Sequence, residues 1–213
     1  MVLDKPSGGA ILHNRKTFVL QRNNFMKKTL IVLMMVLLAA MLMVSCDDSK
    51  ALPSVSKAGD TVTLGNVEWE ALDVDSDNKT ALLISKDVLE LRAFDGYGSK
   101  VYANSTIHTY LKDGFISTYG LSTSYMKATE LTDANVTDYV FLLSKSEVEL
   151  YLGQKADRMA KYNGDGMGWW LRSIYNGTDN YPCVVTADGD YYPIVPTATD
   201  YVGLRPAFWY KWE

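Results

Sequence analysis

The chain has 213 residues, with 21 Lys and Arg against 25 Asp and Glu, a formal net charge of −4, two Cys and two His. An acidic chain without basic runs repels phosphate backbones, so we do not expect nucleic acid as a partner. So few His exclude a His-rich metal centre, and we predict neither a metal ion nor a cofactor.

Residues 26–45 are typical of a targeting sequence. Met26-Lys27-Lys28 precedes an apolar run, Leu30–Val44, which ends at Ser45-Cys46. A basic start, an apolar core and a small residue before the cut indicate a secretory signal, and the run is shorter than the roughly 20 residues of a bilayer span. We predict a signal peptide over residues 26–45. Residues 1–25 are interpreted as an upstream extension from a mis-assigned gene start, with a long basic region as the alternative.

Met43-Val44-Ser45-Cys46 resembles a bacterial lipobox, whose cysteine receives a diacylglycerol and becomes the first mature residue. The resemblance implies a lipoprotein carrying palmitate-like acyl chains at Cys46, attached to the membrane of the bacterial cell envelope and outside the cytoplasm. An uncleaved membrane anchor is the alternative. Cleavage before Cys46 leaves one free cysteine, Cys183, which we expect to be a buried apolar side chain in a fold without disulfides.

After cleavage, 168 residues remain, which is a size for one domain. Polar residues over 46–59 predict a flexible tether, and residues 60–213 a single domain. Alternating apolar and polar residues predict three strands, the first two joined in a hairpin by Gly65-Asn66. These strands are Thr61–Leu64, Val67–Val74 and Thr80–Ser85.

Two helices are predicted in the middle of the domain. Asn104 or Ser105 can cap a helix that carries Ile107, Leu111 and Phe115 on one side.

The second helix begins at Ser144-Lys145-Ser146-Glu147, which fits a capping box. A short apolar strand, Tyr139–Leu143, precedes it, and residues 156–162 are expected to form a further turn or short helix.

Strands return in the last third of the chain. Asp188-Gly189 is a hairpin signal between two of them. The predicted segments are Gly168–Ser173, Tyr181–Thr186, Asp190–Ile194 and Val202–Tyr210. Strands, then helices, then strands favour an α+β fold with a small antiparallel twisted sheet.

Three segments resemble a bacterial family of unknown function that is common in extracellular proteins and lipoproteins: Leu64–Trp69, Trp169–Ser173 and Gly203–Ala207. The pattern in turn resembles the disulfide-free C-type-lectin-like fold shared with formylglycine-generating-enzyme-like domains. That resemblance implies that the tryptophan strand pairs with the late Gly-x-Arg-Pro strand near the centre of a sheet. The residues that carry this motif are Trp69, Trp169, Gly203, Arg205 and Pro206.

The same resemblance gives no activity. The Glu-Pro-Asn and Trp-Asn-Asp motifs of the calcium-dependent lectins are missing from the sequence, and one free thiol cannot replace the cysteine pair of the oxidising enzymes. We predict no catalytic residue.

Candidate ligand-binding residues lie on the tryptophan strand and in the tyrosine-rich segment after it, because tyrosines with small polar neighbours are typical of adaptable binding loops. They are Trp170, Arg172, Tyr175, Asn176, Tyr181, Tyr191, Tyr192 and Tyr201. A structural role is the alternative for each: Trp170 in the core, Arg172 bound to carbonyls or a carboxylate, Arg205 in a buried ion pair, and the tyrosines on a plain sheet surface.

The sequence therefore predicts a lipid-anchored envelope module that binds a glycan, peptide or protein. An envelope hydrolase using carboxylates and a purely structural domain are the alternatives.

The lipid anchor gives the first testable prediction. Mass spectrometry of the mature protein should find an acylated Cys46 as the first residue, because the lipobox cysteine is modified before cleavage. An unmodified thiol at Cys46, or a cytosolic product that keeps its leader, would contradict this prediction.

Overall fold

A computed structural model describes residues 51–175, 181–192 and 196–212. The described residues belong to one compact unit, Ala51–Glu213. The predicted extension, signal peptide and Cys46 lie outside the described residues. Within the described ranges, no helix combines the length and apolarity needed to cross a bilayer.

The domain begins earlier in the chain than predicted. Val55 is buried in the core, and the Pro53 carbonyl oxygen accepts a hydrogen bond from the Tyr210 hydroxyl at 2.8 Å. The prediction of a flexible tether is therefore wrong for residues 51–59, because an apolar side chain and a backbone hydrogen bond hold this segment against the last strand.

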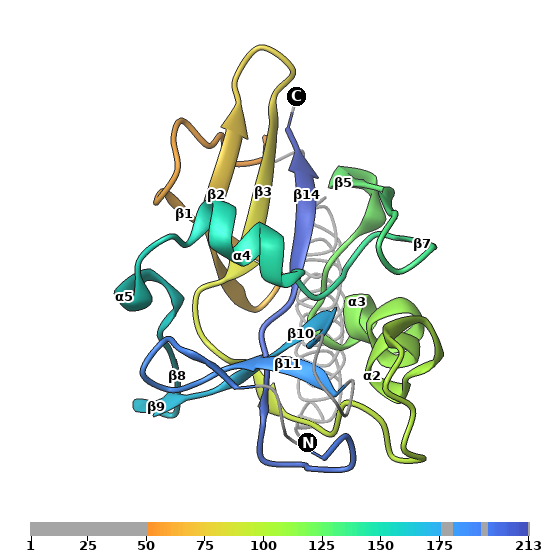
Figure 1. The fold of residues 1–213 in the computed structure, drawn as a ribbon. Helices are drawn as coiled ribbons and strands as arrows, with labels where there is room; N and C mark the ends of the chain where they lie inside the picture. Colours follow the sequence, from red (N-terminus) through yellow and green to blue (C-terminus); the bar gives the residue numbers. More distant parts are fainter. Residues whose placement is uncertain (1–50, 176–180, 193–195, 213) are drawn as a thin grey trace, which may run out of the picture. The chain divides into compact units, whose positions relative to one another are not determined.

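The domain has an α+β fold built on two five-stranded sheets. The first has the order β1-β2-β3-β14-β5, with every neighbouring pair antiparallel. Figure 1 shows β2, β3 and β14 running alongside one another. Its strands are β1 (Thr61–Leu64), β2 (Val67–Asp75), β3 (Thr80–Ser85), β5 (Met126–Lys127) and β14 (Ala207–Lys211).

The three strands predicted at the start of the domain are confirmed. Gly65 makes the turn between β1 and β2 with φ +58°, a conformation that side chains disfavour. A Cβ at this position would lie 2.1 Å from the Tyr119 carbonyl oxygen, so the turn also needs glycine for space.

The second sheet has the order β12-β11-β10-β13-β4, and its β10–β13 pair is parallel. The predicted hairpin across Asp188-Gly189 is confirmed, since β11 pairs antiparallel with β12. The strands are β4 (Glu90–Leu91), β10 (Trp169–Ile174), β11 (Pro182–Val185), β12 (Tyr191–Tyr192) and β13 (Gly203–Leu204). Two separate hairpins pair β6 (Thr129–Leu131) with β7 (Val136–Asp138) and β8 (Ala160–Tyr162) with β9 (Asp165–Met167).

The last predicted strand, Val202–Tyr210, is wrong as a single element. It divides into β13, in the second sheet, and β14, in the first. Pro206 lies between them and has no N–H to donate to a ladder, whereas its carbonyl oxygen accepts from Ser85 N at 2.9 Å. Gly203 is needed for close packing, because a Cβ there would lie 2.6 Å from both methyl groups of Val88.

The first predicted helix is confirmed, with Ser105 as its cap. The Ser105 hydroxyl accepts from His108 N at 3.2 Å. The helix then loosens into a π turn before a final short α segment, and it buries Ile107, Leu111 and Phe115. Its parts are α2 (Thr106–Tyr110), η2 (Leu111–Phe115) and α3 (Ile116–Thr118), with short 3-10 turns at η1 (Tyr102–Asn104) and η3 (Thr123–Tyr125).

The second helix, α4 (Lys145–Tyr151), has the predicted capping box. Ser144 N donates to Glu147 Oε2 at 2.7 Å, and Glu147 N donates to Ser144 Oγ at 3.1 Å. The strand predicted before it is reduced to one bridge between Phe141 and Ala207. Over residues 156–162 the predicted helix is correct only at its start, because α5 (Lys155–Arg158) ends where β8 begins.

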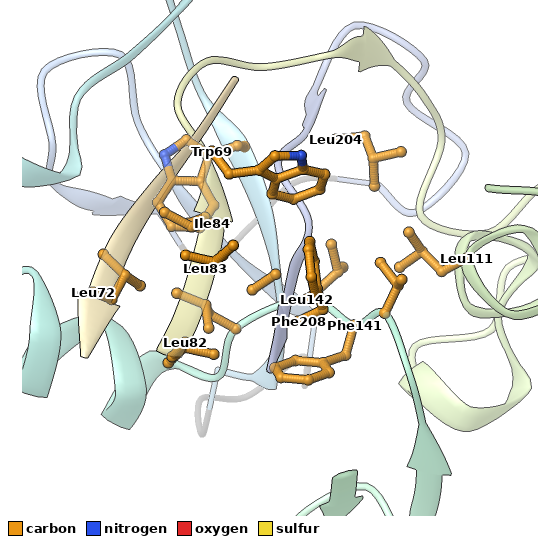
Figure 2. Close-up of a cluster of buried hydrophobic side chains, with 14 of the residues drawn as sticks. Trp69, Leu72, Leu82, Leu83, Ile84, Leu111, Phe141, Leu142, Leu204 and Phe208 are labelled. Carbon is orange, nitrogen blue, oxygen red and sulfur yellow. The ribbon is translucent and has the colours of Figure 1, made fainter. Parts of the chain in front are cut away.

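One core joins the two sheets and the helices. In Figure 2, Trp69 from β2, Leu204 from β13 and Leu111 from η2 contribute to the same buried cluster. Phe208 packs edge-on against Trp69 with ring centroids 4.7 Å apart. Cys183 is fully buried, and burial raises the pKa of its thiol to about 11, which fits the predicted apolar role.

Arg205 ties the two sheets together where the chain crosses between them. Its Nε donates to the Ser85 carbonyl oxygen at 3.0 Å, its Nη2 donates to the Lys86 carbonyl oxygen at 3.2 Å, and its guanidinium lies 5.0 Å from the ring of Trp169. Burial lowers the pKa of Arg205 to about 10. The predicted buried ion pair is wrong, because carbonyl oxygens and an aromatic ring, not a carboxylate, surround this cation among the described residues.

The crossover gives a stability prediction. Arg205→Lys should lower the free energy of unfolding by about 2–3 kcal/mol, because lysine cannot reach two carbonyls and stack on Trp169 at once. Denaturant unfolding of the full chain measures this. The control is Arg92→Lys, which keeps a partly exposed ion pair with Glu90 and should cost less than about 1 kcal/mol. Equal costs for the two variants would contradict the role of Arg205.

Candidate functional site

A buried arginine organises the most polar part of the interior. Arg172 of β10 donates from Nη1 and Nη2 to the two carboxylate oxygens of Glu147, each at 2.7 Å. Its Nε donates to Asp133 Oδ1 at 2.9 Å, and Nη1 also donates to the Leu142 carbonyl oxygen at 2.7 Å. Charge-assisted, bidentate bonds of this kind are the strongest that a guanidinium makes. The structural alternative for Arg172 is thus confirmed.

The charges of Arg172, Glu147 and Asp133, which form an ion cluster, do not cancel. Burial alone would lower the pKa of Arg172, but the hydrogen bond and charge of Glu147, followed by those of Asp133, raise it above its ordinary value. Arg172 therefore stays a cation between two carboxylates, and the three groups together carry one negative charge. The Arg172 side chain is 4% exposed and that of Asp133 is 44% exposed, so solvent meets the carboxylate rather than the guanidinium.

A second buried polar group lies beside the cluster. His108 Nε2 is 3.0 Å from Asp138 Oδ2, and His108 Nδ1 is 3.1 Å from the Ala103 carbonyl oxygen. Each ring nitrogen of His108 thus lies within hydrogen-bond distance of an oxygen, one from a carboxyl group and one from the backbone. The Tyr102 ring packs on His108 with centroids 4.8 Å apart.

Tyr102 is buried with an unsatisfied hydroxyl. Its oxygen has no hydrogen-bond partner among the described residues. Burial raises the pKa of Tyr102, as do the charges of Asp138 and Asp133, while the Leu142 backbone and the charge of Arg172 oppose the shift. The hydroxyl thus stays protonated and lies among these charged groups. An unpaired buried polar atom is uncommon in native proteins.

A cavity of about 400 Å³ opens at this cluster. Its lining combines a phenol, a carboxylate, a guanidinium and a hydroxyl with three apolar side chains. The lining residues are Val101, Tyr102, Asp133, Ala134, Arg172, Ser173 and Ile174. This volume lies in the lower part of the range of small-molecule sites, so the cavity is the candidate site.

Trp170 cannot serve as the predicted stacking platform. Its side chain is 0% exposed, it packs edge-on against Phe94, and its Nε1 donates to the Arg92 carbonyl oxygen at 2.7 Å. The prediction assumed one solvent-facing side of β10. Instead both faces of β10 are covered, so Trp170 belongs to the core together with Trp169.

The candidate tyrosines fall into separate places. Tyr175 follows the lining residue Ile174, and its N donates to the Tyr181 carbonyl oxygen at 2.9 Å. The Tyr181 ring lies 3.9 Å from Lys100 Nζ, next to the lining residue Val101. Both tyrosines are thus linked to neighbours of lining residues, but neither of them lines the cavity itself.

The other tyrosines lie elsewhere. Tyr191 and Tyr192 are on β12, at one edge of the second sheet and two strands from β10. Tyr191 packs against the cations of Arg158 and Lys145. Tyr201 is exposed just before β13. The predicted tyrosine cluster is therefore divided, and Asn176 lies outside the described residues.

Three residues of this site were not predicted to belong to it. Glu147 was predicted only as a helix cap, and its bond to Arg172 joins positions 25 residues apart. Asp133 and Tyr102 were not predicted, because no local pattern distinguishes them from turn and core residues.

In the described part of the chain, no three His, Cys, Asp or Glu side chains gather closely enough to hold a metal ion.

The fold and the cavity define an α+β domain that has a small polar pocket among the described residues. The chain belongs to the family described as "Domain of unknown function (DUF6273)", whose model matches residues 78–212. The match includes Trp169–Ser173 and Gly203–Ala207 but leaves out Leu64–Trp69. No curated protein and no solved structure matches the chain.

The unpaired hydroxyl gives a testable contrast. Tyr102→Phe should leave the free energy of unfolding unchanged or raise it by up to about 1 kcal/mol, because the lost hydroxyl has no partner. Tyr210→Phe is the matched control and should lower it by about 1 kcal/mol, since this hydroxyl donates to Pro53. Denaturant unfolding of both variants measures the difference. A larger cost for Tyr102→Phe would mean that its hydroxyl is paired.

Proposed function

We propose that this protein is a lipid-anchored module of the bacterial cell envelope, and that its domain binds a glycan, peptide or protein without catalysing a reaction. The lipobox-like segment at Cys46 supports the anchor and the location outside the cytoplasm. One observation carries the binding role: a cavity of about 400 Å³ with a polar wall and an unpaired hydroxyl.

The rigidity of that wall favours binding. Arg172 is fixed by Glu147, Asp133 and the Leu142 carbonyl oxygen, and Ser173 Oγ accepts from Lys145 N at 2.9 Å. Side chains held by such bonds lose little entropy when a ligand arrives, and preorganisation of this kind raises affinity.

A C-type-lectin-like fold is part of the proposal. It is supported by the parallel pairing of Trp169 with Gly203, inside the second sheet, which the resemblance implies for a tryptophan strand and a Gly-x-Arg-Pro strand. Fold alone does not give function, so the argument for binding depends on the cavity.

The hydrolase alternative is less well supported. Glycoside hydrolysis normally uses a pair of carboxyl groups, one of which must give up a proton. Of the residues that line the cavity, only Asp133 has a carboxylate, and it is paired with Arg172.

A blocking variant tests the proposed site. The full chain, solubilised in a mild detergent, is screened against glycan and peptide arrays. Ala134→Trp should weaken any binding at least about tenfold, because the indole fills the cavity, whereas Ala134→Ser should bind like the original protein.

The outcomes separate the binding function from hydrolysis. No ligand on any array, or binding that ignores Ala134→Trp, would contradict the binding proposal. Turnover of glycosides or esters that Ala134→Trp abolishes would instead favour the hydrolase.

A further inference from the structure

The charge of the cavity wall selects among the possible ligands. Arg172 is shared by Glu147 and Asp133, so the group of three keeps one negative charge. The exposed member is Asp133, whereas the guanidinium is 4% exposed. A phosphate, sulfate or carboxylate ligand would therefore meet a like charge first, and a buried like-charge contact is costly.

The wall of the cavity contains both hydrogen-bond donors and hydrogen-bond acceptors. Asp133 offers carboxylate oxygens that accept. The Tyr102 hydroxyl has no partner and can donate or accept. The Ser173 oxygen already accepts from Lys145 N, which leaves its own proton free to be donated. Such a set suits a ligand whose groups also both donate and accept, as adjacent hydroxyls do.

Apolar contacts complete the site. Val101, Ala134 and Ile174 line the same cavity, together with the ring-bearing Tyr102. Aromatic and aliphatic surfaces pack against the C–H faces of a sugar ring, while its hydroxyls bind the polar wall.

We propose that the cavity between Tyr102, Asp133 and Ser173 binds an uncharged carbohydrate residue, with Asp133 accepting from two of its hydroxyls and Tyr102 pairing with another. This inference rests on the proposed binding function and names the ligand class of the same site. A cationic amine would pair with Asp133 as well, but an ammonium group has no acceptor for the Ser173 proton and does not use the apolar wall.

The test uses the full chain in detergent and measures dissociation constants by isothermal titration. The probes are neutral oligosaccharides of hexoses and N-acetylhexosamines, the corresponding uronic-acid and sulfated oligosaccharides, and an amine-bearing glucosamine oligomer. The variants are Tyr102→Phe and Asp133→Asn. The matched controls are Tyr125→Phe, whose hydroxyl accepts from Ser122 N, and Asp113→Asn, which is exposed on η2.

A neutral oligosaccharide should bind best. Tyr102→Phe should weaken that binding about fivefold to tenfold and Asp133→Asn at least as much, while both controls leave it unchanged. Preference for the anionic or the amine-bearing probe would overturn the inference, as would equal binding by all variants. If a peptide from the array binds in an Ala134→Trp-sensitive way and no sugar does, the binding function stands and the carbohydrate assignment fails. If nothing binds, both fail.

Discussion

The bidentate bond between Arg172 and Glu147 is the interaction on which the rest of the site depends. It joins the middle of β10 to the first turn of α4, and the same guanidinium reaches the Leu142 carbonyl and Asp133, in the turn between β6 and β7. A buried cation is stable only when its charge and hydrogen bonds are met together. These segments must therefore be in register before the cavity can exist. Arg205 links the two sheets in a comparable way, but its partners are backbone carbonyl oxygens and the indole ring of Trp169.

Local patterns predicted much of the fold. The first three strands, the turn at Gly65, the cap at Ser105, the capping box of α4 and the Asp188-Gly189 hairpin all depend on neighbours within about five residues, and each is confirmed. The α+β class followed from the order of these elements. These predictions were accurate because alternating apolar residues, capping side chains and turn residues determine structure within a short stretch of chain.

Contacts over long sequence separations were not predictable in the same way. The structure has two five-stranded sheets where one sheet was predicted. The chain leaves β13 after Leu204, passes through Arg205 and Pro206, and continues as β14 in the other sheet. Trp170 was predicted to face solvent, but it lies in the core. A strand that is buried on both faces has no alternation of apolar and polar residues from which its burial could be predicted. Of the candidate ligand residues, Arg172 lines the cavity. Ser173 follows Arg172 in the chain, whereas the other polar lining residues, Tyr102 and Asp133, come from distant turns, and only the fold brings them together.

We propose that the ion cluster of Arg172, Glu147 and Asp133 shapes a pocket for a ligand. The cluster itself can be tested directly. A double-mutant cycle with Arg172→Met and Glu147→Gln, measured by denaturant unfolding of the full chain, gives their coupling energy. Glutamine retains an oxygen for the capping bond from Ser144 N, so the cycle isolates the ion pair. We predict that each single variant costs about 3–5 kcal/mol and that the double variant costs little more than either one. Additive single costs, with a coupling below about 0.5 kcal/mol, would contradict the account.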